Sequence, residues 1–376
     1  MIADAVRRAV SAVVDPELRR PIGELDMVRG IDVEGDRAHV AIALTIVGCP
    51  AADRIEREVR AAAASVEGIV DVEIEVGVMT PAERAALTER LRGRSRAMPF
   101  GPDSLTRVIA VTSGKGGVGK STVTANLAVA LAARGLAVGL IDADVHGFSI
   151  PGLLGLVGDD GLPPQPTRVG ELMLPPVAYD VKAISIGMFL PRDAPSAGAV
   201  AWRGPMLHRT VQQFLTDVFF GDLDILLIDM PPGTGDVAIS VGQLLPHAEI
   251  VVVTTPQTAA ADVAVRSGVV ARQTGQRIIG VIENMSALTL PDGTRLDLFG
   301  SGGGEAVARA LSVDEEVPLL GSVPLSTSLR AGGDAGAPVV VTDPDDAAAR
   351  ALQDIAESIA SRPRGLSGRS LPVAPA

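Results

Sequence analysis

Two of only three lysines in this 376-residue chain, Lys115 and Lys120, lie in one glycine-rich segment. The segment from Gly114 to Ser121 reads GKGGVGKS and fits the pattern G-x-x-x-x-G-K-S in full. Glycines let backbone N–H groups approach and surround a phosphate, and a lysine ammonium is compact enough to reach it. The segment therefore predicts a phosphate-binding loop.

The stretches on either side of the loop favour this interpretation. Residues 107–112 form a short apolar run with β-branched residues, which is typical of a buried strand, and residues 122–134 have the pattern of a helix that closes on Gly135. A helix that begins after a strand and a glycine loop presents its positive end to an anion. The alternative is an ordinary glycine-rich turn between strand and helix.

Residue types within the loop suggest individual roles. We expect Lys120 to reach the β- and γ-phosphates and Ser121 to ligate Mg²⁺ through its hydroxyl oxygen. The whole loop is expected to contact the nucleotide, namely Gly114, Lys115, Gly116, Gly117, Val118, Gly119, Lys120, Ser121 and Thr122.

Two apolar runs that end in aspartate supply candidate carboxylates. One run leads into Asp142-Ala-Asp144, and residues 223–228 lead into Asp229. Because ligands bind beyond the carboxyl ends of parallel strands, we expect Asp229 to hold Mg²⁺ through water and Asp144 to position an attacking water. The alternative is that these acids only cap the helices that follow.

The expected nucleotide is ATP. Guanine is commonly read by an Asn-Lys-x-Asp motif, and none of the three lysines has that context. Asn284 follows an apolar strand pattern at 278–282, and its amide offers both a donor and an acceptor to an adenine edge. A turn or a helix cap is the other role open to this asparagine.

Composition argues against several classes of protein. The net charge of −12 argues against a general polyanion-binding surface, and 2% aromatic residues argue against stacking on nucleic acid. No apolar run reaches the ~18 residues of a membrane span, and the N-terminus lacks a secretory pattern. With Cys49 as the single cysteine, no intramolecular disulfide can form. We expect a cytoplasmic protein with neither nucleic acid nor membrane as a partner.

The order of patterns along the chain predicts an α/β fold in two parts. Residues 1–92 have the pattern of a small α+β domain, 93–104 of a linker and 363–376 of a disordered tail. Between them, residues 105–362 alternate apolar strands with helices, which favours a mostly parallel sheet flanked by helices. The candidate strands are 107–112, 137–142, 223–229, 249–254, 278–283 and 319–323.

The additional lysine at the second position of GKGGVGKS resembles the deviant Walker A group of P-loop ATPases. A longer set of motifs is similar to the Mrp/ApbC family of iron–sulfur cluster carriers and to the small domain often fused in front of it. These motifs are Asp142-Ala-Asp-Val-His-Gly147, Trp202-Arg-Gly-Pro-Met206, Asp229-Met-Pro-Pro-Gly-Thr-Gly-Asp236, Glu283-Asn-Met-Ser286, Asp15-Pro-Glu17 and Gly48-Cys-Pro50.

The resemblance implies a P-loop NTPase fold and a homodimer that hydrolyses ATP with Mg²⁺. In that group the extra lysine, here Lys115, reaches the phosphates of the partner subunit. The family holds an iron–sulfur cluster between subunits and passes it to apoproteins, so recipients and cluster-assembly proteins are the expected partners.

One departure from the family concerns the cluster ligands. Cluster-carrying members have C-x-x-C shortly after the E-N-M-S segment, whereas residues 287–300 here contain no cysteine. Clusters are usually held by four thiolates, and a dimer of this chain has two, both Cys49. Cys49 is either a cluster-contacting thiol or a small buried residue beside a turn. Two other functions therefore stay open: an assembly ATPase that binds no cluster, and a nucleotide-switched scaffold on DNA or membrane.

Overall fold

The computed structural model describes residues 2–46, 51–92, 99–145, 147–170, 172–190, 204–290 and 292–362. The chain divides into two compact units. The first comprises 1–97 together with 166–177 and 217–221, and the second comprises 98–165, 178–216 and 222–376. No helix in the described ranges is both long and apolar enough to cross a membrane.

The second unit is built on an eight-stranded sheet in which seven strands run parallel. In sheet order the strands are β10 (Val177–Ala178), β11 (Val181–Ser185), β7 (Val138–Asp142), β12 (Ile225–Asp229), β6 (Arg107–Ser113), β13 (Glu249–Thr254), β14 (Arg277–Ser286) and β17 (Leu319–Pro324). The central strands are buried along nearly their whole length, which explains why they appear in the sequence as continuous apolar runs.

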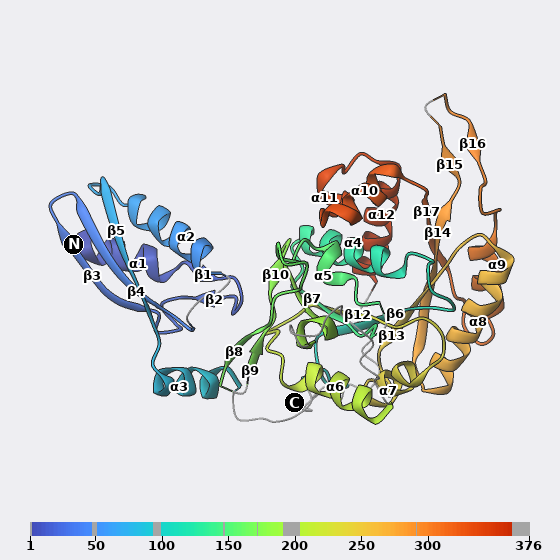
Figure 1. Cartoon of the computed structure of the whole chain (residues 1–376), viewed down its shortest axis with the longest axis horizontal. Coiled ribbons are helices and arrows are strands. Elements are labelled where there is room, and N and C mark those ends of the chain that lie inside the picture. The colour runs from blue at the N-terminus through green and yellow to red at the C-terminus, as the bar shows by residue number, and fades with distance from the viewer. Residues whose placement is uncertain are drawn as a thin grey trace, which may run out of the picture. The chain divides into compact units, whose positions relative to one another are not determined.

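Helices cover both faces of this sheet (Figure 1). One face carries α4 (Lys120–Ala133), α5 (Ile150–Leu153), α10 (Thr327–Ala335), α11 (Val339–Thr342) and α12 (Ala347–Ser361). The other face carries α6 (Gly204–Thr216), α7 (Asp236–Leu244) and α8 (Thr258–Gln273), with α9 (Gly303–Leu311) packed against α8. The short elements are η1 (Ile186–Phe189) and the hairpin of β15 (Leu288–Thr289) and β16 (Arg295–Leu296).

This architecture confirms the predicted fold class. All six predicted strands occur, and their ends differ from the predicted ends by at most three residues. The pattern did not predict β11, because its five residues include Lys182, an unusual residue for a buried strand. The structure nevertheless buries Lys182 completely.

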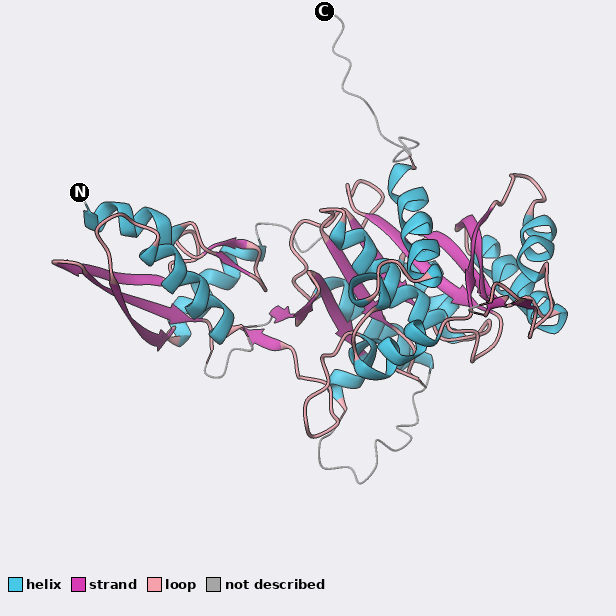
Figure 2. Cartoon of the chain, turned by 90° about the horizontal axis from the view of Figure 1, so that it is seen from above, coloured by secondary structure: helices cyan, strands magenta, loops and turns pink. Residues whose placement is uncertain are grey.

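The first unit has a three-stranded sheet in the order β3-β4-β5, with α1 and α2 packed against it (Figure 2). Strands β3 and β4 are antiparallel, and β4 and β5 are parallel. Its elements are α1 (Ile2–Ser11), β1 (Val14–Asp15), β2 (Arg20–Pro21), β3 (Val28–Glu34), β4 (Arg37–Leu44), α2 (Ala52–Ala64), β5 (Asp71–Val78), α3 (Pro81–Arg92), β8 (Thr167–Val169) and β9 (Leu172–Leu174). The predicted small α+β fold is therefore present. The β8–β9 hairpin, from the middle of the chain, joins it.

The glycine loop is fixed in place by its contact with α8. A Cβ atom added to Gly114 would lie 2.6 Å from the carbonyl oxygen of Val263 and would also collide with the Val263 carbonyl carbon and the Ala264 nitrogen. Two pieces of backbone therefore meet where only glycine fits. At Gly116, two positions on, the nearest such atom is Pro232 Cγ at 3.9 Å, which is ordinary van der Waals contact.

We predict that Gly114→Ala destabilises the protein by about 1–3 kcal/mol, because backbone cannot move aside as a side chain can. Gly116→Ala is the matched control from the same loop and should leave the free energy of unfolding nearly unchanged. Urea denaturation of both variants measures the difference. Equal effects of the two substitutions would contradict the close packing at Gly114.

Candidate functional site

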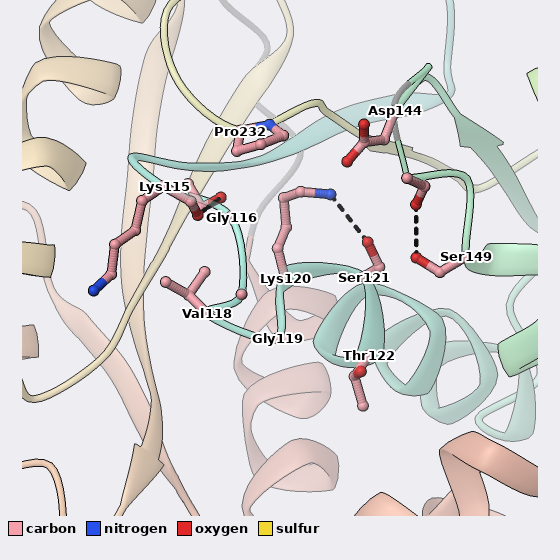
Figure 3. Close-up of a pocket in the computed structure, with 13 residues that line it drawn as sticks. Lys115, Gly116, Val118, Gly119, Lys120, Ser121, Thr122, Asp144, Ser149 and Pro232 are labelled. Carbon is pink, nitrogen blue, oxygen red and sulfur yellow. Dashed lines mark hydrogen bonds between the residues drawn. The ribbon is translucent and has the colours of Figure 1, made fainter. Parts of the chain in front are cut away.

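A cleft of about 370 Å³ opens at the carboxyl end of β6, where the glycine loop leads into α4 (Figure 3). Most of the predicted loop residues line it, joined by residues from the segments after β7 and β12. The lining residues are Ser113, Lys115, Gly116, Gly117, Val118, Gly119, Lys120, Ser121, Thr122, Asp144, Gly147, Ser149 and Pro232. The cleft has the lining expected of a phosphate site.

The loop takes a backbone conformation that needs glycine at two places. Gly117 and Gly119 have φ angles of 79° and 77°, in the left-handed region that favours glycine. Gly119 is also the N-cap of α4, and no side chain caps the helix there. The first N–H groups of a 14-residue helix therefore face the cleft without a side-chain acceptor.

The strongest polar cluster of the site surrounds the carboxylate of Asp229. Lys120 Nζ lies 2.7 Å from Asp229 Oδ1, and Ser121 Oγ donates to Asp229 Oδ2 at 2.6 Å. Thr124 Oγ1 lies 3.0 Å from Oδ1. Asp229 is fully buried, and Lys120 is 5% exposed. Three of the first five residues of α4 thus converge on one acid at the end of β12.

Burial determines the electrostatics of the two strand-end acids. Loss of solvation raises the pKa of the Asp142 carboxyl well above its ordinary value, and repulsion from Asp229 raises it further. Loss of solvation also raises the pKa of Asp229, although Lys120 and the hydroxyl donors oppose that rise. In this protein the two acids lie at paired positions of neighbouring strands. A cation in the cleft would favour the charged form of both.

Asp142 organises the segment that carries Asp144. Its Oδ1 accepts from the Asp144 backbone N–H at 3.2 Å, and its Oδ2 accepts from Ile150 N at 3.3 Å and Ser185 Oγ at 2.9 Å. Asp144 lines the cleft beyond this anchor (Figure 3). In the same segment Ser149 Oγ donates to the Gly147 carbonyl.

The two loop lysines project in different directions (Figure 3). Lys120 faces Ser121 and Asp229, whereas Lys115 Nζ donates to Gln257 Oε1 at 3.2 Å, at the start of α8. Within the described ranges no carboxylate forms an ion pair with Lys115. Its ammonium therefore projects away from the phosphate cleft of its own chain.

The amide of Asn284 contacts the loop itself. Asn284 Nδ2 donates to the Val118 carbonyl at 2.8 Å, and the residue is buried. A Cβ atom on Gly119 would collide with that amide nitrogen. Asn284 thus supports the loop from β14 and is not among the residues that line the cleft.

The fold brings most of the predicted site residues together. The phosphate loop, Asp144 and Asp229 meet at one edge of the sheet, whereas Cys49 lies outside the described residues. No group of three or more histidine, cysteine or acidic side chains in the described part of the chain is placed to hold a metal ion. Sequence reasoning found Asp142 at a strand end and gave it no role of its own. It missed Thr124 and Gln257, although Thr124, three residues after Ser121 on the same helix face, has a spacing that signals it.

The fold and the loop define a P-loop NTPase. The chain belongs to the family described as the NUBPL iron-transfer P-loop NTPase, whose model matches residues 104–360. A second family model, described as an iron–sulfur cluster assembly protein, matches residues 3–76. Both matches confirm the resemblance predicted from the motifs.

Individual relatives match nearly the whole chain. A protein named iron–sulfur cluster carrier protein from Mycobacterium tuberculosis is 55% identical over 377 residues, covering 99% of this chain and 96% of the relative. A protein of the same name from Synechocystis is 41% identical over 364 residues, covering 96% and 98%. A solved nucleotide-binding protein in complex with ADP from Archaeoglobus fulgidus is 36% identical, with a TM-score of 0.48 and coverage of 64% of this chain and 89% of that chain.

The buried ion pair between Lys120 and Asp229 allows a prediction about the stability of the protein without nucleotide. Lys120→Ala leaves the Asp229 charge buried without its cation, so it should lower the free energy of unfolding by about 3–5 kcal/mol. The double variant Lys120→Ala/Asp229→Ala should lose less than the sum of the two single variants, because no charge is left alone. Urea denaturation of the four proteins of this cycle measures the coupling.

Lys115→Ala is the control for this cycle, since it removes a lysine of the same loop without breaking an ion pair. It should change stability little. Strict additivity in the cycle would mean that the Lys120–Asp229 pair is not formed in solution.

Proposed function

We propose that this chain is a Mg²⁺-dependent ATPase. The observation that carries the proposal is that Lys120 and Ser121, which line the cleft beside the glycine loop, converge on the buried carboxylate of Asp229. An ammonium, a hydroxyl oxygen and a carboxylate are the groups that a nucleotide phosphate and its hard cation require. The adenine role predicted for Asn284 belongs to the same proposal.

The donor set at the cleft fits Mg²⁺. Ser121 would ligate the ion and Asp229 would hold it through water, and Mg²⁺ when bound neutralises charge on the phosphates. The side chains and backbone of the cleft bind the phosphates and orient the water. The loop N–H groups orient the phosphates, and Lys120 exchanges its contact with Asp229 for the β- and γ-phosphates. Asp144 lies on a separate segment of the wall, where it orients a water for attack.

We further propose that the active form is a homodimer. Lys115 projects away from the cleft of its own chain, and its ammonium is held only by an uncharged amide oxygen among the described residues. A cation in that state can transfer to the phosphates of a second copy at small cost. This is the arrangement implied by the deviant Walker A resemblance.

Measurements of ATP binding and of hydrolysis should separate the roles of Lys120 and Asp144. Lys120→Ala should abolish both tight ATP binding and turnover, because it removes the charge that faces the phosphates. Asp144→Ala should keep ATP affinity within a few-fold and lower kcat by about 10²–10⁴, because it orients water and does not hold the ligand. Calorimetric binding and phosphate release measured on both variants test this. Wild-type turnover in Lys120→Ala would refute the phosphate-loop assignment, and loss of affinity in Asp144→Ala would move Asp144 to the metal site.

We propose that the ATPase serves iron–sulfur cluster transfer to apoproteins in the cytoplasm. Its support is the name shared by relatives that match nearly the whole chain at 41–55% identity. In this proposal residues 1–92 form an assembly domain, 93–104 link it to the ATPase domain at 105–362, and 363–376 form a tail. The linker and tail lie largely outside the described residues.

The cluster itself is cargo, and Cys49 is the one thiol that can hold it. Two copies of the chain supply two thiolates, so a cluster shared by a dimer needs further ligands from a recipient, a small thiol or a non-cysteine side chain. Such a cluster would be labile, which suits transfer. The absence of any other cysteine favours a second candidate function, an assembly ATPase that holds no cluster.

Anaerobic reconstitution with iron and sulfide distinguishes the two. The carrier should gain visible charge-transfer absorbance as a dimer or larger species, and Cys49→Ala should abolish that absorbance while leaving ATP hydrolysis intact. A stoichiometric cluster in Cys49→Ala would show that other ligands exist. Wild-type protein that hydrolyses ATP and binds no iron would establish the assembly ATPase.

A further inference from the structure

Strand β5 forms one edge of the three-stranded sheet in the first unit. Among the described residues it pairs only with β4, in unbroken register, and its eight residues contain neither proline nor lysine. The opposite edge, β3, is interrupted by a β-bulge between Val28 and Gly30. Bulges, prolines and lysines are devices that keep the edge of a sheet from pairing with another strand. The β5 edge has none of the three.

Hydrogen bonds near the two ends of β5 show which of its backbone groups face β4. The Met79 N–H, directly after the strand, donates to the Leu44 carbonyl at the end of β4. The Val72 carbonyl accepts instead from the side chain of Arg60, on α2. Since the backbone groups of a strand alternate between its two sides, the odd-numbered residues of β5 face β4 and the even-numbered residues face the free edge.

Three even-numbered residues, Ile74, Val76 and Val78, follow Val72 along this edge. No strand or side chain in the described ranges receives their outward backbone groups. Val76 and Val78 are also 42% and 41% exposed. The edge therefore offers three consecutive N–H donors and three C=O acceptors to an added strand.

The side chains of β5 form an apolar row and an acidic row. The apolar row faces the helices, since Val72 lies in the same core cluster as residues of α2. By alternation, Glu73 and Glu75 lie on the face that α1 and α2 leave uncovered (Figure 2). Both acids are exposed, and neither forms a hydrogen bond or an ion pair within the described part of the chain. An added strand would meet uncompensated negative charge on this face.

A groove of about 330 Å³ lies on the same open face, beside Glu75. Small residues, among them Ala43 of β4 and its register partner Gly77 of β5, line it. Its lining also includes Glu83, in the first turn of α3, which pairs with Arg29 at 2.9 Å. Because Gly77 has no side chain, a long cationic side chain that enters from the β5 edge can lie over it, with its charge near Glu75.

We propose that the β5 edge binds an extended segment of a partner protein by strand addition, and that basic and apolar residues alternate in this segment. Backbone pairing with Ile74, Val76 and Val78 supplies the affinity, and the side chains supply the selectivity. Apolar residues of the segment cover the exposed valines on one face. Basic residues pair with Glu73 and Glu75 on the other face, where the groove accommodates one of them. This docking surface is independent of the proposed ATP site.

A second copy of this chain does not fit the same edge. Two β5 strands paired edge to edge would bring Glu73 and Glu75 of one copy beside the same acids of the other. Like charges across a strand pair are destabilising, whereas opposite charges stabilise it. The chain as a whole carries a net charge of −12, which adds to the repulsion. Charge complementarity therefore selects a basic partner.

Hydrogen exchange of the full chain, resolved by residue with NMR, tests strand addition. The probe is a synthetic peptide of alternating valine and arginine with blocked ends. At saturation it should slow exchange at Ile74, Val76 and Val78 by about tenfold or more, as new backbone hydrogen bonds do. Glu75 and Gly77 should change little, because their N–H groups already face β4. A peptide that fails to bind, or that slows odd and even residues alike, overturns the proposal.

A matched pair of variants at one position tests the backbone contact. Val76→Pro removes an N–H that faces the free edge and leaves the pairing with β4 intact, so the fold should persist by circular dichroism. It should weaken binding of the peptide by about tenfold or more, whereas Val76→Thr, which keeps the N–H, should stay within about twofold. Equal losses in the two variants overturn strand addition.

A second pair of variants tests the charge preference. Glu75→Lys should weaken binding of the valine–arginine peptide by about tenfold, because it turns an attractive cross-strand pair into a repulsive one. Glu67→Lys, an equal change of charge at an exposed position in the turn before β5, should have little effect. Equal losses in both would show general charge attraction only and overturn the docking surface. A nucleotide-free dimer of the wild type that Val76→Pro dissociates would make a second copy the occupant and overturn the basic partner.

Discussion

The buried carboxylate of Asp229 is the group on which the site depends. A carboxylate that is fully buried at the end of a central strand is shielded from solvent, so the protein must supply its hydrogen-bond donors. Three side chains from the first five residues of α4, Lys120, Ser121 and Thr124, lie against it. This requirement fixes where α4 begins and how the glycine loop enters it. Close packing of Gly114 on the α8 backbone holds the other end of the loop.

The same arrangement explains how a phosphate site can be preformed without being blocked. The Lys120 ammonium is paired with the Asp229 carboxylate, so it carries no unpaired charge in a low-dielectric cleft. In the proposed function, a bound phosphate would offer that ammonium a second anion, and a cation held by Ser121 and Asp229 would replace it beside the acid. Binding would then exchange partners among charges that are already oriented, which limits the cost of reorganisation.

Parallel strands bring a second acid to the same edge. Asp142 and Asp229 are register partners on β7 and β12, so each carboxylate lies in the field of the other. The contacts of Asp142 differ from those of Asp229. Its oxygens accept hydrogen bonds from two backbone N–H groups in the segment after β7 and from the hydroxyl of Ser185 at the end of β11. One acid therefore organises the phosphate loop, and the other organises the segment that carries Asp144.

The sequence alone determined the phosphate loop, the parallel sheet and the two strand-end acids, because each depends on local patterns: glycine spacing, apolar runs and the residue that ends a strand. The tertiary structure decided the contacts between residues that are distant in sequence, which local patterns do not encode. It paired Lys120 with Asp229 across 109 positions, turned the amide of Asn284 onto the loop carbonyl of Val118, and placed β8 and β9 in the core of the first unit. Such contacts depend on which strands become neighbours and which buried polar groups must then satisfy one another, and neither is a property of any local stretch of sequence.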